Sequence, residues 1–201
     1  MFQKYIVLSF VIAAVSAGQK LVWEDNFDGG SIDRSKFTFE TGKGDNGWGN
    51  AELQHYTDRS ENARIENGHL VIEARRENFE GSAFTSARII TKGLMEFKYG
   101  TLEARIKLPS QKKGLWPAFW TLGANIGQVG WPNCGEIDIL ETGSADAIAN
   151  NAVNNQVGGA THWENNAMYN TVHRADFDLS ADFHNYKLTW TDANEYSNGD
   201  I

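Results

Sequence analysis

Short runs in which every second side chain is apolar limit the fold of this chain more than any other feature. In residues 101–108 the apolar side chains alternate with Thr, Glu, Arg and Lys. Residues 64–74, around the pair Asn67-Gly68, and residues 183–191 show similar alternation. Because neighbouring side chains of a strand point to opposite faces, each run predicts an antiparallel strand with one buried face. Glycine-rich turns separate the runs, so the sequence predicts an all-β domain, a sandwich or a barrel.

Few segments depart from this pattern. Helical periodicity is limited to about one turn near residues 33–37. Residues 145–166 are rich in Asn and Gly, and we expect them to form a long loop over one face of the domain. Since no internal repeat or linker interrupts the chain, the sequence predicts a single domain.

Acidic residues outnumber basic ones, which excludes several kinds of partner. The 201 residues include 18 Lys and Arg and 26 Asp and Glu, for a net charge of −8. Nucleic acids and anionic membrane surfaces bind basic footprints, so neither is an expected partner. Because Cys134 is the single cysteine, the chain has no internal disulfide framework and no cysteine-cluster zinc site. We expect Cys134 to pack as a small hydrophobic residue and the protein to be a monomer.

The first 17 residues have the pattern of a secretory signal peptide. Lys4 supplies a positive charge, residues 5–15 form an apolar run broken only by Ser9, and residues 15–17 are a small-residue cleavage site. The run is too short to span a bilayer, which needs ~20 apolar residues. The alternative is a buried N-terminal strand or helix. We therefore expect residues 1–17 to be removed, residues 18–201 to form the folded domain, and the mature protein to be extracellular.

An acidic stretch, residues 135–141, carries the chemistry of the chain. In a regular strand Glu136 and Asp138 point to one face, and Glu141 points to the other. A β-bulge of one extra residue near Ile139-Leu140 would return Glu141 to the acidic face. Three acids on one face repel one another, so the face is either open to water or shifts their pKa values. A pair of carboxylates is what cleavage of a glycosidic bond requires, and the alternative is a solvated acidic strand.

Residues 136–141, EIDILE, resemble the signature of glycoside hydrolase family 16 in its bulged, laminarinase-type form. The resemblance covers most of residues 21–190. It implies a curved two-sheet β-sandwich, a concanavalin-like jelly roll, with a glycan cleft across its concave face. The further segments that carry it are LVWEDNF (21–27), GWGNAELQHY (47–56), ENARIENGHLVIEAR (61–75), TSARIITKG (85–93), FKYGTLEARIKLP (97–109), LWPAFWTLG (115–123) and WPNCG (131–135).

The resemblance also implies a reaction. Glu136 would be the nucleophile and Glu141 the general acid/base, while Asp138 would orient Glu136 and help to set its protonation. The implied function is a secreted, retaining endo-β-glucanase that hydrolyses 1,3-β-glucan or mixed 1,3/1,4-β-glucan. The alternative is a non-catalytic β-glucan recognition protein of innate immunity on the same fold. Such proteins usually lose catalytic acids, whereas all three are present here.

Seven further residues match cleft positions of the family. For the tryptophans among them the alternative role is core packing, and for the arginine it is a surface ion pair. For the asparagine the alternative is a turn, and for the histidine a place in a loop. The remaining histidines are expected to be structural or exposed. The expected substrate-binding residues are Trp116, Trp120, Trp131, Arg88, Asn50, Glu52 and His162.

The family often binds a structural calcium ion through an N-terminal acid and a C-terminal aspartate. Asn26 stands where an acid is common, which argues against that site. We expect no catalytic metal and no required cofactor. The family domain also continues past residues 183–191 with several more strands, whereas this sequence stops at Ile201. The C-terminal strands are therefore expected to be missing, and an inactive truncation product is a third possibility.

Overall fold

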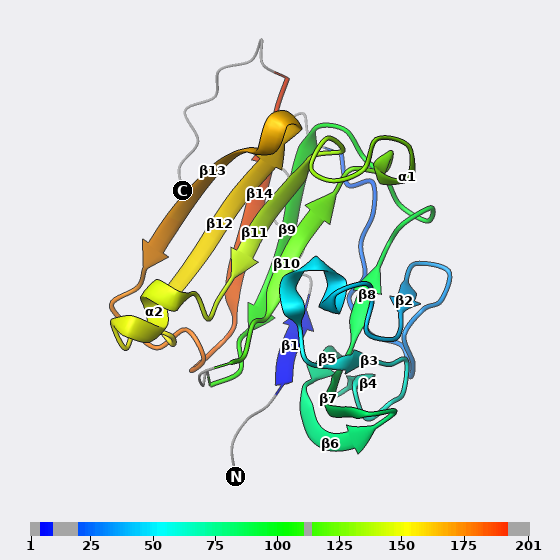
Figure 1. Ribbon diagram of the computed structural model, residues 1–201. Coiled ribbons are helices and arrows are strands. Elements are labelled where there is room, and N and C mark those ends of the chain that lie inside the picture. Colours follow the sequence, from blue (N-terminus) through cyan, green and yellow to red (C-terminus); the bar gives the residue numbers. More distant parts are fainter. Residues whose placement is uncertain (1–4, 10–19, 111–113, 193–201) are drawn as a thin grey trace. The chain divides into compact units, whose positions relative to one another are not determined.

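The computed structural model describes the backbone of residues 5–9 and, in full, residues 20–110 and 114–192. The chain divides into two compact units, residues 1–96 and residues 97–201 (Figure 1). Strands dominate both units, which confirms the all-β prediction. In the described part of the chain, no helix has the length and apolar character needed to cross a membrane.

Small sheets make up the N-terminal unit. The elements are β1 Tyr5–Ser9, β2 Thr38–Glu40, the π-helical turn η1 Gly47–Ala51, β3 His55–Tyr56, β4 Ala63–Glu66, β5 His69–Glu73, β6 Arg75–Phe79, β7 Ser82–Ser86 and β8 Arg88–Ile90. Strand β5 pairs antiparallel with β1 and with β4, and β2 pairs antiparallel with β8. Strand β7 pairs parallel with β3 and antiparallel with β6.

The alternation in residues 64–74 forms the hairpin of β4 and β5. Asn67 and Gly68 join the two strands with φ angles of 54° and 73°. Two successive positive φ angles are those of a type I′ turn, which Asn-Gly favours because its twist matches that of the strands. Leu70 and Val71 of β5 are buried. The antiparallel strands predicted in residues 64–74 are therefore confirmed.

Strand β1 lies within the predicted signal peptide. Its backbone pairs antiparallel with β5, from Tyr5 opposite Glu73 to Leu8 opposite Leu70. An apolar segment that stays attached can satisfy the open hydrogen-bonding groups of a sheet edge in this way. This pairing corresponds to the strand alternative for the N-terminus. Most of residues 1–17 lie outside the described residues, and cleavage of the leader stays a prediction.

The C-terminal unit holds a four-stranded sheet and a strand pair. In the sheet the order is β10-β11-β12-β13, with every neighbour antiparallel, and β9 pairs antiparallel with β14 (Figure 1). The elements are β9 Gly100–Lys107, β10 Ala118–Leu122, α1 Ile126–Val129, β11 Glu136–Glu141, α2 Ala145–Ala149, β12 Gln156–Trp163, the 3-10 turn η2 Glu164–Asn166, β13 Ala167–Arg174 and β14 His184–Trp190.

The core of this unit lies between the sheet and the strand pair. Ala104 and Ile106 of β9 are fully buried, and Tyr186 of β14 is buried with them. From the sheet, Leu140 of β11 is fully buried, and β11 contacts β14. The alternating runs at residues 101–108 and 183–191 therefore form strands with their apolar residues inward, as predicted.

The loop prediction for residues 145–166 is wrong, because this segment forms α2 and β12. The Oγ of Ser144 caps α2 by accepting a hydrogen bond from the Ala147 N–H at 3.1 Å. The pair Gly158-Gly159, which resembles a turn in the sequence, lies inside β12. A Cβ atom at Gly159 would come within 3.1 Å of the Asp138 carbonyl oxygen. Glycine at this position therefore allows β11 and β12 to approach closely rather than turning the chain.

Candidate active site

A β-bulge in β11 gathers the three acids on one face. Asp138 pairs with Trp120 on β10 and Glu141 pairs with Ala118, so three steps on β11 match two on β10. The register of β12 shifts at the same place. On β10, the partners of Glu136, Asp138 and Glu141 are Leu122, Trp120 and Ala118. These are every second residue of β10 and share a face, so the acids share it too. The predicted bulge is confirmed.

Asp138 lies in the middle of the acid row and is the most buried of the three acids. It is 6% exposed. Burial, followed by the charges of Glu141 and Glu136, raises the pKa of Asp138 to about 7. Its carboxyl group therefore holds a proton in mildly acidic solution, when an ordinary aspartate is ionised.

Glu141, at the end of the row, also titrates above its ordinary range. Burial is the largest cause of its raised pKa, and the charge of Glu136 adds to it. Two groups act in the opposite direction and lower the pKa, a hydrogen bond from Trp116 and the charge of His162. A carboxyl whose pKa is raised by burial is suited to act as a proton donor.

Two tryptophans each donate a hydrogen bond to an outer acid. The indole N–H of Trp116 donates to Oε1 of Glu141 at 2.9 Å. The indole N–H of Trp131 donates to Oε2 of Glu136 at 3.1 Å. Their exposed fractions, 50% for Trp116 and 54% for Trp131, exclude the alternative of core packing. Each indole therefore fixes the direction of one carboxyl, while stacking on sugar stays a prediction.

His162 faces the acid row from the neighbouring strand. It pairs with Glu136 across β11 and β12. Its Nε2 lies 3.3 Å from Oδ2 of Asp138 and 3.9 Å from Oε1 of Glu136. The ring of Trp131 lies against the imidazole, with 5.7 Å between centroids. The structure thus excludes the loop alternative for His162 and brings it to the acids.

The other predicted residues, Asn50, Glu52 and Arg88, belong to the N-terminal unit. Asn50, in η1, donates to Oε1 of Glu52 at 3.3 Å. Arg88, on β8, forms an ion pair with Glu40 on β2, with 2.6 Å between Nε and Oε2. Its guanidinium also lies 4.9 Å from the centre of the Trp48 ring. This ion pair matches the alternative role expected for Arg88, except that the side chain is largely buried and not on the surface. Contacts of these residues with sugar stay predictions.

Tyr56 also contacts Glu52, although it was not among the site residues predicted from the sequence. Its hydroxyl donates to Oε2 of Glu52 at 2.7 Å, and Gln54 donates to the same oxygen. Burial, together with the bond to Glu52, raises the pKa of Tyr56 well above its usual range. The signal was present in the sequence, because Glu52, Gln54 and Tyr56 are every second residue of an extended segment and therefore share a face.

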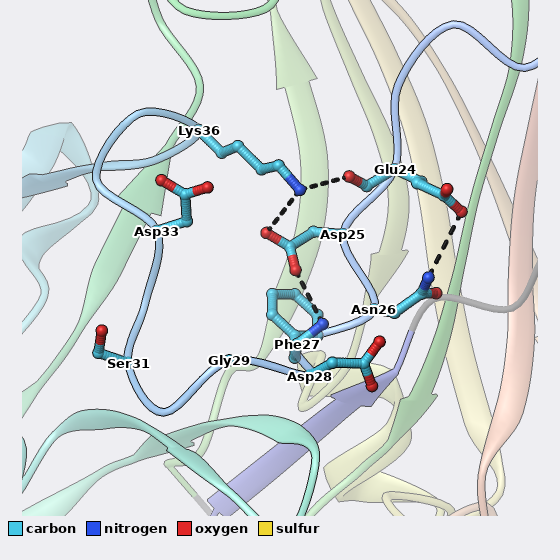
Figure 2. Close-up of a pocket in the computed structure, with 9 residues that line it drawn as sticks. All are labelled: Glu24, Asp25, Asn26, Phe27, Asp28, Gly29, Ser31, Asp33 and Lys36. Carbon is cyan, nitrogen blue, oxygen red and sulfur yellow. Dashed lines mark hydrogen bonds and ion pairs between the residues drawn. The ribbon is translucent and has the colours of Figure 1, made fainter.

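A separate acidic pocket lies in the N-terminal unit, in the segment where the family resemblance implies a calcium ligand. Figure 2 shows Lys36 reaching into it, where Nζ donates to the Glu24 carbonyl at 2.8 Å and lies 3.3 Å from Oδ2 of Asp25. Asn26 donates to Oε2 of Glu24 at 3.5 Å. Calcium needs six to eight oxygen ligands. With the Lys36 ammonium at these oxygens, the residues do not fit the ion.

Three comparisons place the chain among known proteins. It is 43% identical over 183 residues to the glucan endo-1,3-beta-glucosidase of Cryptopygus antarcticus, covering 85% of this chain and 63% of that protein. It is 41% identical over 172 residues to the clotting factor G alpha subunit of Tachypleus tridentatus, covering 85% of this chain and 24% of that protein. The chain thus spans less than two thirds of either relative.

The solved structures agree with the fold. The laminarinase catalytic domain of Thermotoga maritima superposes with a TM-score of 0.74 at 46% identity, covering 86% of this chain and 70% of that one. This likeness confirms the predicted jelly-roll class, a two-sheet β-sandwich. Residues 50–195, which include the whole acid row, match the family described as glycosyl hydrolases family 16. On these grounds the chain belongs to glycosyl hydrolases family 16.

Proposed function

We propose that the chain is the catalytic domain of a secreted endo-β-glucanase that hydrolyses 1,3-β-glucan, or mixed 1,3/1,4-β-glucan, with retention. The observation that carries the proposal is the row of Glu136, Asp138 and Glu141 on one face of β11, with its two tryptophan donors. The family supports a glycosidase, and the relative from Cryptopygus antarcticus and the laminarinase domain from Thermotoga maritima support the substrate.

The proposed reaction has two displacements. Protonated Glu141 gives its proton to the glycosidic oxygen while Glu136 attacks the anomeric carbon, so the glycosidic bond breaks and a glycosyl ester forms. Glu141, now ionised, takes a proton from water, which attacks the anomeric carbon and releases Glu136. The raised pKa of Glu141 favours the protonated form that the first step needs. Asp138, when protonated, places a neutral group between the two glutamates instead of a third charge.

The face around the acids suits a neutral polysaccharide. Opposite Glu141, β12 carries Gly158, which has no side chain, and opposite Asp138 it carries Ala160, whose side chain is a single methyl group, so neither residue crowds the acids. Trp116 and Trp131 are half exposed at the row, and Trp120 lies opposite Asp138. Aromatic faces of this kind can pack on the apolar faces of sugar rings. An acidic floor disfavours sulfated or carboxylated polymers.

A β-glucan recognition protein without activity is the second candidate. The relative from Tachypleus tridentatus is named for clotting rather than for hydrolysis. All three acids are present, and the pKa values of Asp138 and Glu141 are raised. Both observations favour the enzyme. Release of reducing ends from laminarin separates the two functions, because a recognition protein binds the polymer without cleaving it.

Product stereochemistry tests the mechanism directly. Proton NMR in the first minutes of laminarin hydrolysis is expected to show the β-anomer, with the α-anomer appearing later by mutarotation. Laminarin is also expected to be cleaved faster than carboxymethyl-cellulose, chitin, agarose or carrageenan. An α-anomer as first product would rule out the glycosyl ester, and binding of laminarin without new reducing ends would support the recognition protein.

The Trp116 hydrogen bond predicts a shift in the pH profile. Trp116→Phe removes a bond that lowers the pKa of Glu141, so that pKa should rise. The alkaline limb of kcat/KM reports the general acid of the free enzyme and is therefore expected to move to higher pH. Trp163→Phe, which changes a half-exposed tryptophan at the end of β12, is the control. An alkaline limb that stays in place, or moves to lower pH, would contradict this role.

Secretion is part of the proposal and rests on the N-terminal sequence. Lys4, the apolar run and the small residues before Gly18 form the leader pattern. A secreted enzyme of this kind would meet its neutral polysaccharide substrate outside the cell. Edman sequencing of the protein from the culture medium of a secreting host is expected to begin at Gly18.

A further inference from the structure

Glu136, Asp138 and His162 form a cluster of potential metal ligands at one end of the acid row. One donor atom of each lies within 4.8 Å of the other two. The strand register brings them together, because Glu136 and His162 are direct partners and Asp138 is two residues along on the same face. The cluster joins an imidazole nitrogen to two carboxylate oxygens, and this mixed donor set distinguishes it from a simple acidic patch.

The two distances from His162 to the carboxylates are close to those around a tetrahedral ion. Zinc bonds to nitrogen and oxygen at roughly 2.1 Å, so neighbouring ligands in a tetrahedron lie about 3.4 Å apart. Here Nε2 of His162 is 3.3 Å from Oδ2 of Asp138 and 3.9 Å from Oε1 of Glu136. The donors of Glu136 and Asp138 lie within 4.8 Å of each other, so the two carboxylates would draw together around the ion. Calcium, which takes six to eight oxygens at 2.3–2.6 Å, fits this set poorly.

The surroundings favour binding at this point. Trp131 donates to Oε2 of Glu136, while Oε1 is the oxygen nearest His162. Such hydrogen bonds from neighbouring side chains commonly orient metal ligands. The side chains of His162, Glu136 and Asp138 are 20%, 18% and 5% exposed, so the cluster is largely buried but still accessible to solvent. Three protein ligands with access to solvent suit a zinc ion that keeps a fourth position for water.

We propose that Glu136, Asp138 and His162 bind a divalent first-row transition metal ion, with Zn²⁺ as its type, and that the ion blocks the active site. A bound ion would occupy Oε1 of Glu136 and cancel the negative charge that attacks the anomeric carbon. Metal and glucan would therefore exclude each other. The inhibition half of this inference rests on the proposed function, whereas the binding half does not.

Calorimetric titration of the full chain with zinc chloride tests the binding half. One site is expected, and His162→Ala is expected to weaken it by about tenfold or more. His173→Ala is the matched control, because His173 is exposed on β13 and, five residues from the partner of His162, faces the other side of the sheet. Its affinity for zinc should equal that of the unchanged chain. No binding, or equal binding by the His162→Ala variant, would overturn the site.

Cobalt provides a second readout that does not depend on activity. Tetrahedral Co²⁺ absorbs strongly in the visible range, so the unchanged chain and the His173→Ala variant should develop this absorption and the His162→Ala variant should not. Circular dichroism of each variant shows whether it is folded. Absorption that survives the loss of His162 in a folded variant would place the metal elsewhere and overturn the site.

Kinetics test the inhibition half. Zinc is expected to raise the KM for laminarin without lowering kcat, and EDTA should restore the original KM. Zinc that binds through His162 but leaves an active enzyme unaffected would overturn the inhibition. Zinc binding by a protein that never cleaves glucan would refute the proposed function and still support the metal site, so the two failures are distinguishable.

Discussion

Glu136→Gln is expected to lower kcat on laminarin by about 10⁴-fold or more, since removing a nucleophile abolishes the covalent route. Glu141→Gln is expected to cost about 10²–10⁴-fold, the usual contribution of a general acid/base. Both changes keep the size of the side chain and an oxygen that can accept the indole hydrogen bonds from Trp131 and Trp116. Initial rates of reducing-end release measure both losses. Glu164→Gln, at an exposed position in η2, is the control and should leave the rate unchanged.

Azide separates the two roles. In Glu141→Ala an aryl glycoside with a good leaving group can still form the glycosyl ester, and azide needs no base to attack it, so a β-glycosyl azide is expected. In Glu136→Ala any rescue proceeds by direct displacement and gives the α-azide. If Glu136→Ala gave the β-azide and Glu141→Ala gave the α-azide, the two roles would be exchanged. A Glu136→Gln variant as active as the parent would refute the assignment.

The geometry of the acid row could be derived from the sequence, because the face on which a strand residue lies depends on whether its separation from another residue is odd or even. Glu136 and Glu141 are five residues apart, an odd number, so they share a face only if one residue is extra. The register on β10 shows that extra residue at the predicted place. The sequence also predicted that residues 136–141 form a strand with an apolar face, and in the structure Leu140 on that strand is fully buried.

The direction of the indole N–H groups could not be derived. Trp116 and Trp131 lie just outside β10 and β11, where no strand periodicity fixes the side chains. Their resemblance to family positions indicated walls for sugar, whereas the structure gives each a hydrogen bond to a carboxyl. Which way an indole turns depends on the path of the connecting segment and on packing, and neither has a short-range signature in the sequence.

The resemblance placed His162 in the cleft, but its position on a strand could not be derived from the residue pattern, for a different reason. Gly158 and Gly159 usually mark a turn, and the many Asn residues around them favour a loop. The close approach of the bulged β11 reverses that preference, because a Cβ atom at Gly159 would lie only 3.1 Å from the Asp138 carbonyl oxygen and the strands would have to move apart. A tertiary contact thus decides the local structure, and once β12 exists its register with β11 carries His162 to Glu136.

Asp138→Asn is expected to stabilise the fold above neutral pH by about 2–4 kcal/mol relative to the unchanged chain. Asp138 is almost fully buried, and its pKa is raised from 3.8 to about 7. The unfolded chain therefore loses this proton near pH 4 and the folded chain only near pH 7. Asparagine keeps the shape of the protonated side chain and carries no charge to bury.

The sign follows from proton linkage. Below about pH 4 both states of the unchanged chain hold the Asp138 proton, and the stability contributed by this group does not vary. Between pH 4 and about 7 the folded state binds more protons than the unfolded state, so the free energy of unfolding falls as the pH rises. A shift of about three pKa units gives at most about 4 kcal/mol, at 1.36 kcal/mol for each unit. Above pH 7 the loss is complete.

Urea unfolding of both chains at a series of pH values measures this difference. The gap in unfolding free energy between Asp138→Asn and the unchanged chain should widen from pH 4 to about 7 and then stay constant. Asp176→Asn, at an exposed aspartate of the same unit, makes the same change of charge and should show no such gap. Asp138→Asn is also expected to lower turnover, because asparagine cannot exchange a proton with Glu136 and Glu141. A variant that is neither more stable at pH 8 nor slower than the parent would show that Asp138 is an ordinary ionised residue. In the proposed mechanism the acid row depends on a buried carboxyl whose raised pKa predicts a loss of fold stability at neutral pH, and this experiment measures that loss.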